Sequence, residues 1–253
     1  GDGLLRVTKA GGIRPVVYPG HQVVVHGYNG KVYGSVVYTK ACAKGDLDVK
    51  DLIIDIGAKD AEDARKYVQE GDVIHLHTYH EELLNGLLCA RAIDDRGGAF
   101  IILEALKRAK EKGCKIGVYA ATTVGEETTM RGAHWAGSAV NPNVAIAVDV
   151  TYTSDNCGIS EAETGDISLG KGPVICNNPS IHKKVNQQLR ACAAKLNMAI
   201  QTEAASGRTG TDGDISGHGV GCQQHSHDSG QEQDLRCLAC EVCHGVASFR
   251  NLW

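Results

Sequence analysis

The chain has 253 residues, 42% of them hydrophobic, and its formal net charge is −4. This length allows a substantial buried core, in one large α/β domain or in two unequal domains. The small negative charge and the absence of Lys/Arg blocks argue against nucleic acid or an anionic membrane as the main partner, so we expect small molecules or peptides instead.

Neither a membrane span nor a secretory signal is expected. No apolar run approaches the roughly 20 residues that a span requires, and the opening "GDGLLRVTKAGG" lacks the pattern of a signal peptide. The ten cysteines are diluted in a long chain and mostly lie within apolar patterns, as Cys114 and Cys192 do. We interpret them as reduced thiols and expect a cytoplasmic protein.

The first part of the chain, to about residue 87, is rich in short β-type runs. These are "LLRVTKA", "QVVVHG", "KVYGSVVY", "DLIIDIGA" and "DVIHLHTY", and Asn29-Gly30 is a strong hairpin signal between the second and the third. Only residues 60–71 interrupt them, as a short helix. This region is predicted to form a small β-barrel or sandwich.

From about residue 88 to 253 helical and strand patterns alternate. The pattern predicts helices over 98–112, 131–140 and 179–197, a last helix from about 231, and strands over 115–122, 144–150 and 198–203. Such alternation indicates an α/β domain with a largely parallel sheet covered by helices.

Acidic residues lie next to these predicted elements. Asp94 and Asp95 precede the first helix, Glu126 and Glu127 follow a strand, and Asp149 ends the next strand. Open α/β sheets bind ligands at such strand ends, where clustered carboxylates would repel one another unless a cation lies between them. A divalent metal such as zinc or cobalt is therefore expected, and such an ion also favours imidazole.

Each acidic pair also has a simpler structural interpretation. An isolated Asp-Asp can cap a helix, and Glu126 with Glu127 can be a first-turn pair favoured by the helix dipole. Asp149 can simply begin a turn. The metal hypothesis depends on all of these residues occurring together.

Six segments occur in an order and spacing that resemble the glutamyl aminopeptidase family, which includes the self-compartmentalising tetrahedral aminopeptidases. They are "DLIIDIGAKDAEDA", "ARAIDDRGG", "EETTMRGA", "AIAVDVT", "SLGKGP" and "GTDGD", and together they span nearly the whole chain. The resemblance implies an α/β catalytic domain that binds two metals and an inserted β-rich domain that mediates oligomer contacts. Residues 1–87 resemble the insert and residues 88–253 the catalytic domain.

The resemblance also implies metal ligands. Asp94 is similar to the carboxylate that bridges the two ions, Glu127 to a terminal ligand of one and Asp149 to a ligand of the other. His227, seven residues ahead of the Asp234-Leu235 pair, resembles the metal histidine.

Two more residues correspond to catalytic positions of the family. Glu126 resembles the general base, and Asp95 resembles the neighbour of the bridging aspartate that holds the backbone turn. A metal pair would activate water while Glu126 moves its proton to the leaving amine.

One ligand of the family is missing. The family has a further metal histidine, two residues ahead of an aspartate, upstream of its β-rich insert, and no His-x-Asp occurs in this chain. We therefore expect two divalent ions, one bound by Asp94, Glu127 and His227 and a weaker one bound by Asp94 and Asp149. The N-terminal side of the catalytic domain is expected to be absent, and the chain in this form can be inactive.

The functional hypothesis is a dinuclear metallo-aminopeptidase that acts on the free amino termini of peptides. The resemblance implies self-association into dimers and a dodecameric hollow particle. An alternative is a non-catalytic relative that assembles or binds peptides. A glycosidase is a weaker alternative, because adjacent carboxylates cannot easily flank a glycosidic bond.

The C-terminal stretch "CLACEVCHG" has two interpretations. Its Cys-x-x-Cys-His spacing occurs in c-type haem attachment and its cysteines could hold a cluster. However, Cys237, Cys240, His244 and Ala247 recur at helical spacing, so a half-buried helix face is the simpler interpretation.

Overall fold

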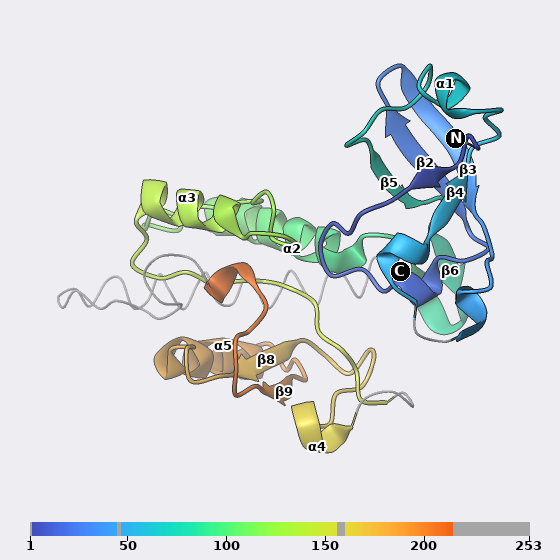
Figure 1. Ribbon diagram of the computed structural model, residues 1–253. Helices are drawn as coiled ribbons and strands as arrows, with labels where there is room; N and C mark the ends of the chain where they lie inside the picture. Colours follow the sequence, from blue (N-terminus) through green and yellow to red (C-terminus); the bar gives the residue numbers. More distant parts are fainter. Residues whose placement is uncertain (1, 45–46, 156–159, 215–253) are drawn as a thin grey trace. The chain divides into compact units, whose positions relative to one another are not determined.

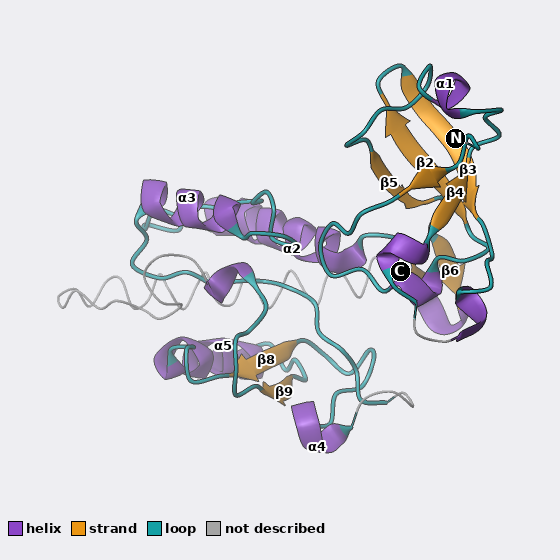
Figure 2. Cartoon of the chain, in the orientation of Figure 1, coloured by secondary structure: helices purple, strands orange, loops and turns teal. Residues whose placement is uncertain are grey.

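The computed structural model describes residues 2–44, 47–155 and 160–214 (Figure 1). The chain forms two compact units. One contains the residues up to Leu83 together with Leu88–Arg91, and the other contains Leu84–Leu87 and the residues from Ala92 onward. Figure 2 shows that strands dominate the first unit and that helices and loops dominate the second.

The first unit contains a five-stranded antiparallel sheet. Its strands are β1 (Leu5–Arg6), β2 (Gln22–Gly27), β3 (Gly30–Val36), β4 (Ile53–Asp55) and β5 (Val73–Leu76). They are ordered β1-β4-β3-β2-β5, so that β4, β3 and β2 lie inside the sheet and β1 and β5 at its edges (Figure 1). The five β-type runs of the sequence are confirmed, and β2 has the predicted bounds.

The predicted hairpin joins β2 to β3. Gly27 pairs with Gly30, so the two turn residues are Tyr28 and Asn29, one position earlier than the Asn-Gly signal suggests. The backbone of Gly30 has a φ of 128°, which glycine adopts readily. Glycine at position 30 therefore begins β3 instead of completing the turn.

Apolar side chains from neighbouring strands form the core of this unit. Val23, Val36, Leu52 and Ile54 are at most 4% exposed and pack together. Because side chains alternate along a strand, Val23 of β2 and Ile54 of β4 can reach the same face of the sheet. The short helix α1 (Ala61–Ala64) follows β4, and β6 (Glu81–Leu83) pairs with β7 (Leu87–Cys89) in a separate small sheet.

The second unit contains four α-helices and two complete strands among its described residues. These are α2 (Ile93–Glu111), α3 (Arg131–Val140), α4 (Glu161–Thr164), β8 (Val174–Asn177), α5 (Lys183–Lys195) and β9 (Gln201–Ala204). Strands β8 and β9 pair in parallel from Val174 with Gln201 to Asn177 with Ala204, and α5 connects them. This β8-α5-β9 arrangement is the crossover unit of an α/β fold.

Several elements of the second unit differ from the sequence prediction. Residues 115–122 and 144–150, predicted as strands, have no strand pairing within the described part of the chain. A strand requires hydrogen bonds to a partner, and an apolar pattern does not identify that partner. Helix α5 begins at Lys183 instead of Pro179, because Asn178 accepts hydrogen bonds from Ser180 in a turn ahead of the helix.

Two predictions made from composition can be compared with the described residues. None of their helices combines the length and the apolar character that a membrane crossing would need. Their five cysteines, Cys42, Cys89, Cys114, Cys176 and Cys192, are free thiols. The predicted helix from about residue 231, with its cysteine-rich stretch, lies outside the described part of the chain.

Candidate active site

The first acidic pair lies where α2 begins. The peptide bond between Asp94 and Asp95 is cis. Asp95 Oδ1 accepts a hydrogen bond of 2.9 Å from the backbone nitrogen of Gly98 and so caps the first regular turn of the helix. A Cβ at position 98 would lie 2.2 Å from the Asp95 carboxylate, so any other residue there would displace that side chain. Asp94 is exposed beside it.

The second acidic pair lies on a tight turn ahead of α3, Gly125–Met130, which we call the acidic turn. The carbonyl oxygen of Gly125 accepts hydrogen bonds from the backbone nitrogens of Thr128, Thr129 and Met130, at 3.3, 2.8 and 2.6 Å. Glu126 and Glu127 lie between this carbonyl and its donors. Three converging hydrogen bonds hold both glutamates on one compact turn.

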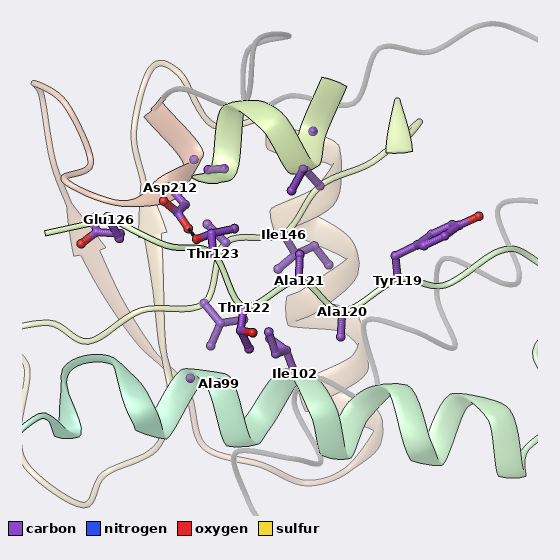
Figure 3. A pocket seen from close by; sticks show the side chains of 18 of the residues that line it. Ala99, Ile102, Tyr119, Ala120, Ala121, Thr122, Thr123, Glu126, Ile146 and Asp212 are labelled. Carbon is purple, nitrogen blue, oxygen red and sulfur yellow. Dashed lines mark hydrogen bonds between the residues drawn. The ribbon is translucent and has the colours of Figure 1, made fainter. Parts of the chain in front are cut away.

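Two further aspartates come from segments distant in sequence. Asp149 follows the apolar run 144–148, and its Oδ1 accepts a hydrogen bond of 2.8 Å from the nitrogen of Val150. Asp212 begins the 3₁₀ turn Asp212–Asp214, and its Oδ2 accepts a hydrogen bond from the Thr123 hydroxyl (Figure 3). Its other oxygen, Oδ1, is buried and has no hydrogen-bond partner among the described residues.

All of these acidic residues line one cavity of about 570 Å³ in the second unit. The cavity lies between α2, α3 and the two apolar segments 117–123 and 144–149, and its acidic lining residues are Asp94, Asp95, Glu126, Glu127, Asp149 and Asp212. Figure 3 shows Glu126, Asp212 and Thr123 toward one end of the labelled side chains and Tyr119 at the other end. Ile102 and Ile146 provide apolar surface between these ends. A cavity of this size, apolar with a few convergent polar groups, is typical of a small-molecule or peptide site.

The crowding of carboxylates changes their acidity. Burial, followed by the negative charges of Asp149 and Glu127, raises the pKa of Glu126 to about 7. Burial also raises the pKa of Asp95 to about 6, although its hydrogen bond from Gly98 opposes the shift. The pKa of Asp149 is raised as well, mainly by burial. A glutamate with a pKa near neutrality is suited to take up and release a proton.

The donor set fits a divalent cation. Carboxylate oxygens are common ligands of such ions, a cation would relieve the repulsion between the acidic groups, and the buried Oδ1 of Asp212 lacks a partner among the described residues. Within residues 2–44, 47–155 and 160–214, however, no group of three or more His, Cys, Asp or Glu side chains is arranged to hold a metal ion. The described carboxylates are therefore a partial ligand set.

The structure brings most of the residues predicted from the sequence to this one cavity. Asp94, Asp95, Glu126, Glu127 and Asp149 line it. His227 lies outside the described residues. The role of each of these side chains stays a prediction.

Asp212 is not among the site residues predicted from the sequence. Its segment "GTDGD" was one of the six that carried the family resemblance, which was the available signal. A hydrogen bond across 89 residues, from Thr123 to Asp212, cannot be read from a local pattern.

The comparisons with known proteins agree on one family. The sequence profile described as M42 glutamyl aminopeptidase matches residues 1–223. A lysyl aminopeptidase of Pyrococcus furiosus is 30% identical over 224 residues, which are 85% of this chain and 63% of that protein. A relative from Acetivibrio thermocellus is 32% identical over 206 residues, 79% of this chain and 59% of that protein. The chain thus spans less than two thirds of the length of these relatives.

Solved structures give the same result. A TET aminopeptidase from a marine sediment thaumarchaeon superposes with a TM-score of 0.78 at 26% identity, over 98% of this chain and 78% of that one. A TET1 peptidase of Pyrococcus horikoshii, which can assemble into a tetrahedron or a large octahedral shell, has a TM-score of 0.72 at 29% identity, over 85% of this chain and 65% of that one. The α/β peptidase fold expected from the sequence is confirmed.

Proposed function

Because the chain belongs to the M42 glutamyl aminopeptidase family, we propose that it is a metal-dependent aminopeptidase that hydrolyses the N-terminal peptide bond of short peptides. The observation that carries the proposal is the cavity in which Glu126, with its pKa raised to about 7, faces several other carboxylates. This is the environment that a general base needs near neutral pH. The names of three relatives, two aminopeptidases and a peptidase, support the same reaction class.

Different residues of this chain would bind the metal ions and transfer the proton. Asp94, Glu127, Asp149 and His227 would hold two divalent ions, zinc or cobalt, and the site of Asp94 and Asp149 would be the weaker one. The bound ions would supply a more acidic water and polarise the peptide carbonyl. Glu126 accepts the proton of the attacking water and delivers it to the leaving amine.

Asp95 has a supporting part in this site. By accepting the hydrogen bond from Gly98, Asp95 fixes the start of α2 and thereby the backbone of Asp94. The apolar part of the cavity, near Ile102 and Ile146, offers a surface on which the apolar part of a peptide can pack.

The experiment is a hydrolysis assay on the full chain with zinc or cobalt. It compares a dipeptide that has a free amino terminus with the same dipeptide N-acetylated. We expect release of the first residue from the free dipeptide only, and a complete loss of release after treatment with a chelator. Hydrolysis that is equal for both peptides, or that survives chelation, would contradict the proposal.

One observation favours a second function, that of a non-catalytic relative that binds peptides or assembles. Over the described residues no trio of side chains is arranged to hold a metal ion. For such a protein the free dipeptide would bind without being cleaved. Calorimetric titration alongside the hydrolysis assay separates the two functions.

We also propose that the first unit is the inserted domain and joins copies of the chain into dimers and then a dodecamer. One solved relative is described as a dodecamer and another as a tetrahedral or octahedral assembly. The edge strand β5 carries Val73, which is 66% exposed, and unpaired sheet edges are surfaces for strand pairing between chains. Light scattering should show a large particle. If β5 takes part, Val73→Lys should reduce its mass, whereas an unchanged mass would exclude β5 from the interface.

A cytoplasmic location is part of the same proposal. The free thiols of the described cysteines support a reducing compartment. Cell fractionation with an antibody against the chain tests it.

A further inference from the structure

The segment 207–214, "GRTGTDGD", is folded around the Asp214 carboxylate, whose side chain is 6% exposed. Its Oδ1 accepts hydrogen bonds from the nitrogen and the hydroxyl of Thr209, at 3.0 and 2.7 Å. Its Oδ2 accepts from the nitrogen of Gly210 at 2.9 Å and from Nε of Arg208 at 3.3 Å. Asp214 thus fixes the shape of this loop, which we call the 207–214 loop.

The 207–214 loop contacts the chain both before and after Glu126 and Glu127 in sequence. Asp212 Oδ2 accepts a hydrogen bond from the hydroxyl of Thr123, two residues before the acidic turn begins. Arg208 Nη2 lies 3.8 Å from the sulfur of Met130, the residue that ends the turn. The loop is therefore attached to the acidic turn at its beginning and at its end.

The residues just ahead of the acidic turn, 123 and 124, also contact α3. The nitrogen of Gly132 donates a hydrogen bond of 3.1 Å to the carbonyl of Val124. A Cβ at position 132 would lie 2.5 Å from both the nitrogen and the oxygen of Val124, so the two backbones are in close contact. With α3 packed on one side, the Thr123 hydroxyl is the polar group through which the loop can fix the position of residues 123–127.

We propose that Asp212 is a positioning residue that, through its hydrogen bond with Thr123, holds the acidic turn so that Glu126 faces the cavity. The consequence for turnover rests on the proposed function. Asp212 and Glu126 line the same cavity, and Figure 3 shows them toward the same end of it. Oδ1 of Asp212 has no hydrogen-bond partner in the described part of the chain. Within that part, Asp212 can therefore act on the turn through the hydrogen bond that its Oδ2 accepts from the Thr123 hydroxyl.

The competing role for Asp212 is a direct electrostatic one, in which the unpartnered oxygen binds a cation or the ammonium group of the peptide. The two roles differ in what they require of the side chain. Positioning requires a hydrogen-bond acceptor at Oδ2, which the amide oxygen of Asn can also provide. Binding a cation requires the negative charge, which Asn lacks.

The experiment uses the full chain with saturating zinc or cobalt and a free dipeptide. It compares Thr123→Val, Asp212→Ala, the double variant and Asp212→Asn. The matched control is Thr202→Val, which removes the exposed hydroxyl that accepts from Arg190 Nη1 at 3.0 Å, in β9. The measurements are kcat, KM, bound metal, and hydrogen exchange of peptides that cover residues 123–130.

We expect Thr123→Val and Asp212→Ala each to lower kcat about 10- to 100-fold, because a small misplacement of a catalytic group has an effect of this size. KM and metal content should change less than about threefold, and the double variant should be no slower than the slower single variant, because the two substitutions remove one interaction. Asp212→Asn should recover most of the kcat that Asp212→Ala loses. Thr202→Val should resemble the wild type.

Other results would overturn the proposal. If Asp212→Asn were as slow as Asp212→Ala, or raised KM strongly, the charge would be the functional property. If the losses of the two single variants multiplied in the double variant, Thr123 and Asp212 would act independently. Should Asp212→Ala unfold, as judged by circular dichroism, Thr123→Val carries the test alone.

Hydrogen exchange tests the role of Asp212 in positioning the acidic turn without requiring that the chain hydrolyse peptides. If the wild type hydrolyses no peptide, the proposed function fails, but exchange over residues 123–130 still tests the attachment. Faster exchange there in Thr123→Val and Asp212→Ala, but not in Thr202→Val, supports it. Unchanged exchange in both variants contradicts it.

Discussion

The first unit and the cavity of the second unit differ in the kind of interaction that holds their residues in place. In the first unit β2 pairs with β3 across a two-residue turn, and Val23 and Val36 of the same hairpin share one core. At the cavity the Thr123 hydroxyl meets a carboxylate 89 residues away. The first unit is thus stabilised by backbone pairing between strands, some of it distant in sequence as between Val23 and Leu76, and by apolar burial, whereas the site depends on single polar contacts between loops. Substitutions in the two regions should therefore have separable effects.

The largest expected effect changes the chemistry without changing the fold. Glu126→Gln should lower kcat by about 10²- to 10⁴-fold with little effect on unfolding, because an amide cannot take up the proton of water. Metal content, measured by atomic emission, should stay at the wild-type value. Glu127→Gln is the matched variant and should lose metal instead. Normal turnover in Glu126→Gln would assign the base to another residue.

The next effect concerns the 207–214 loop. Asp214→Ala removes a carboxylate, 6% exposed, that accepts four hydrogen bonds. It should lower the free energy of unfolding by about 2–4 kcal/mol, because the hydrogen bonds from Arg208, Thr209 and Gly210 lose their shared charged acceptor together. Urea unfolding followed by circular dichroism measures the change. Asp155→Ala, at an exposed carboxylate that accepts from the nitrogen of Leu169, is the control and should lose less.

A smaller effect is expected in the core of the first unit. Val23→Ala removes two methyl groups from a fully buried position and should destabilise this unit by about 2 kcal/mol. Metal content should be unaffected, since the cavity is in the other unit. Val73→Ala, at a position 66% exposed, should have almost no effect on unfolding. A loss of metal in Val23→Ala would show that the two units depend on each other.

The response to pH should also separate the two regions. Folding raises the pKa of Glu126 from 4.5 to about 7 and that of Asp95 from 3.8 to about 6. The folded state therefore binds more protons than the unfolded state in this range, and the stabilisation present at low pH is lost as the pH rises through these folded values. Urea midpoints of the chelator-treated chain should fall between pH 5 and pH 7.5, by a modest amount. A rising midpoint would contradict the predicted direction, and added zinc should reduce the fall.

Local patterns were sufficient for some elements. The predicted bounds of β2 and α3 match the structure, because each pattern is complete within its own segment. Strand β8 was not predicted: it is only four residues long, follows Pro173, and is defined by its pairing with β9. The segments 115–122 and 144–150 show the opposite case. Their apolar pattern predicted strands, but neither pairs with another strand among the described residues.

The candidate site was predictable to a similar extent. Two pairs of consecutive acidic residues and one further aspartate were predicted to lie close together, and all five line one cavity. The raised pKa of Glu126 could not have been predicted, because it depends on burial and on Asp149, 23 positions further along the chain by their numbering. The same holds for Asp212, whose importance lies in its contact with Thr123.

The close approach of Gly132 to Val124 restricts how this protein can be altered. With a Cβ there only 2.5 Å from two backbone atoms, position 132 excludes every amino acid other than glycine unless the start of α3 moves. Attachment of dyes, affinity handles or surface anchors should therefore avoid this position. Gly12 in the first unit is a better choice, because nothing lies within 4 Å of a Cβ placed there. Gly12→Cys, made after the exposed Cys89 is replaced, would place a label at a distance in sequence from every acidic residue of the cavity.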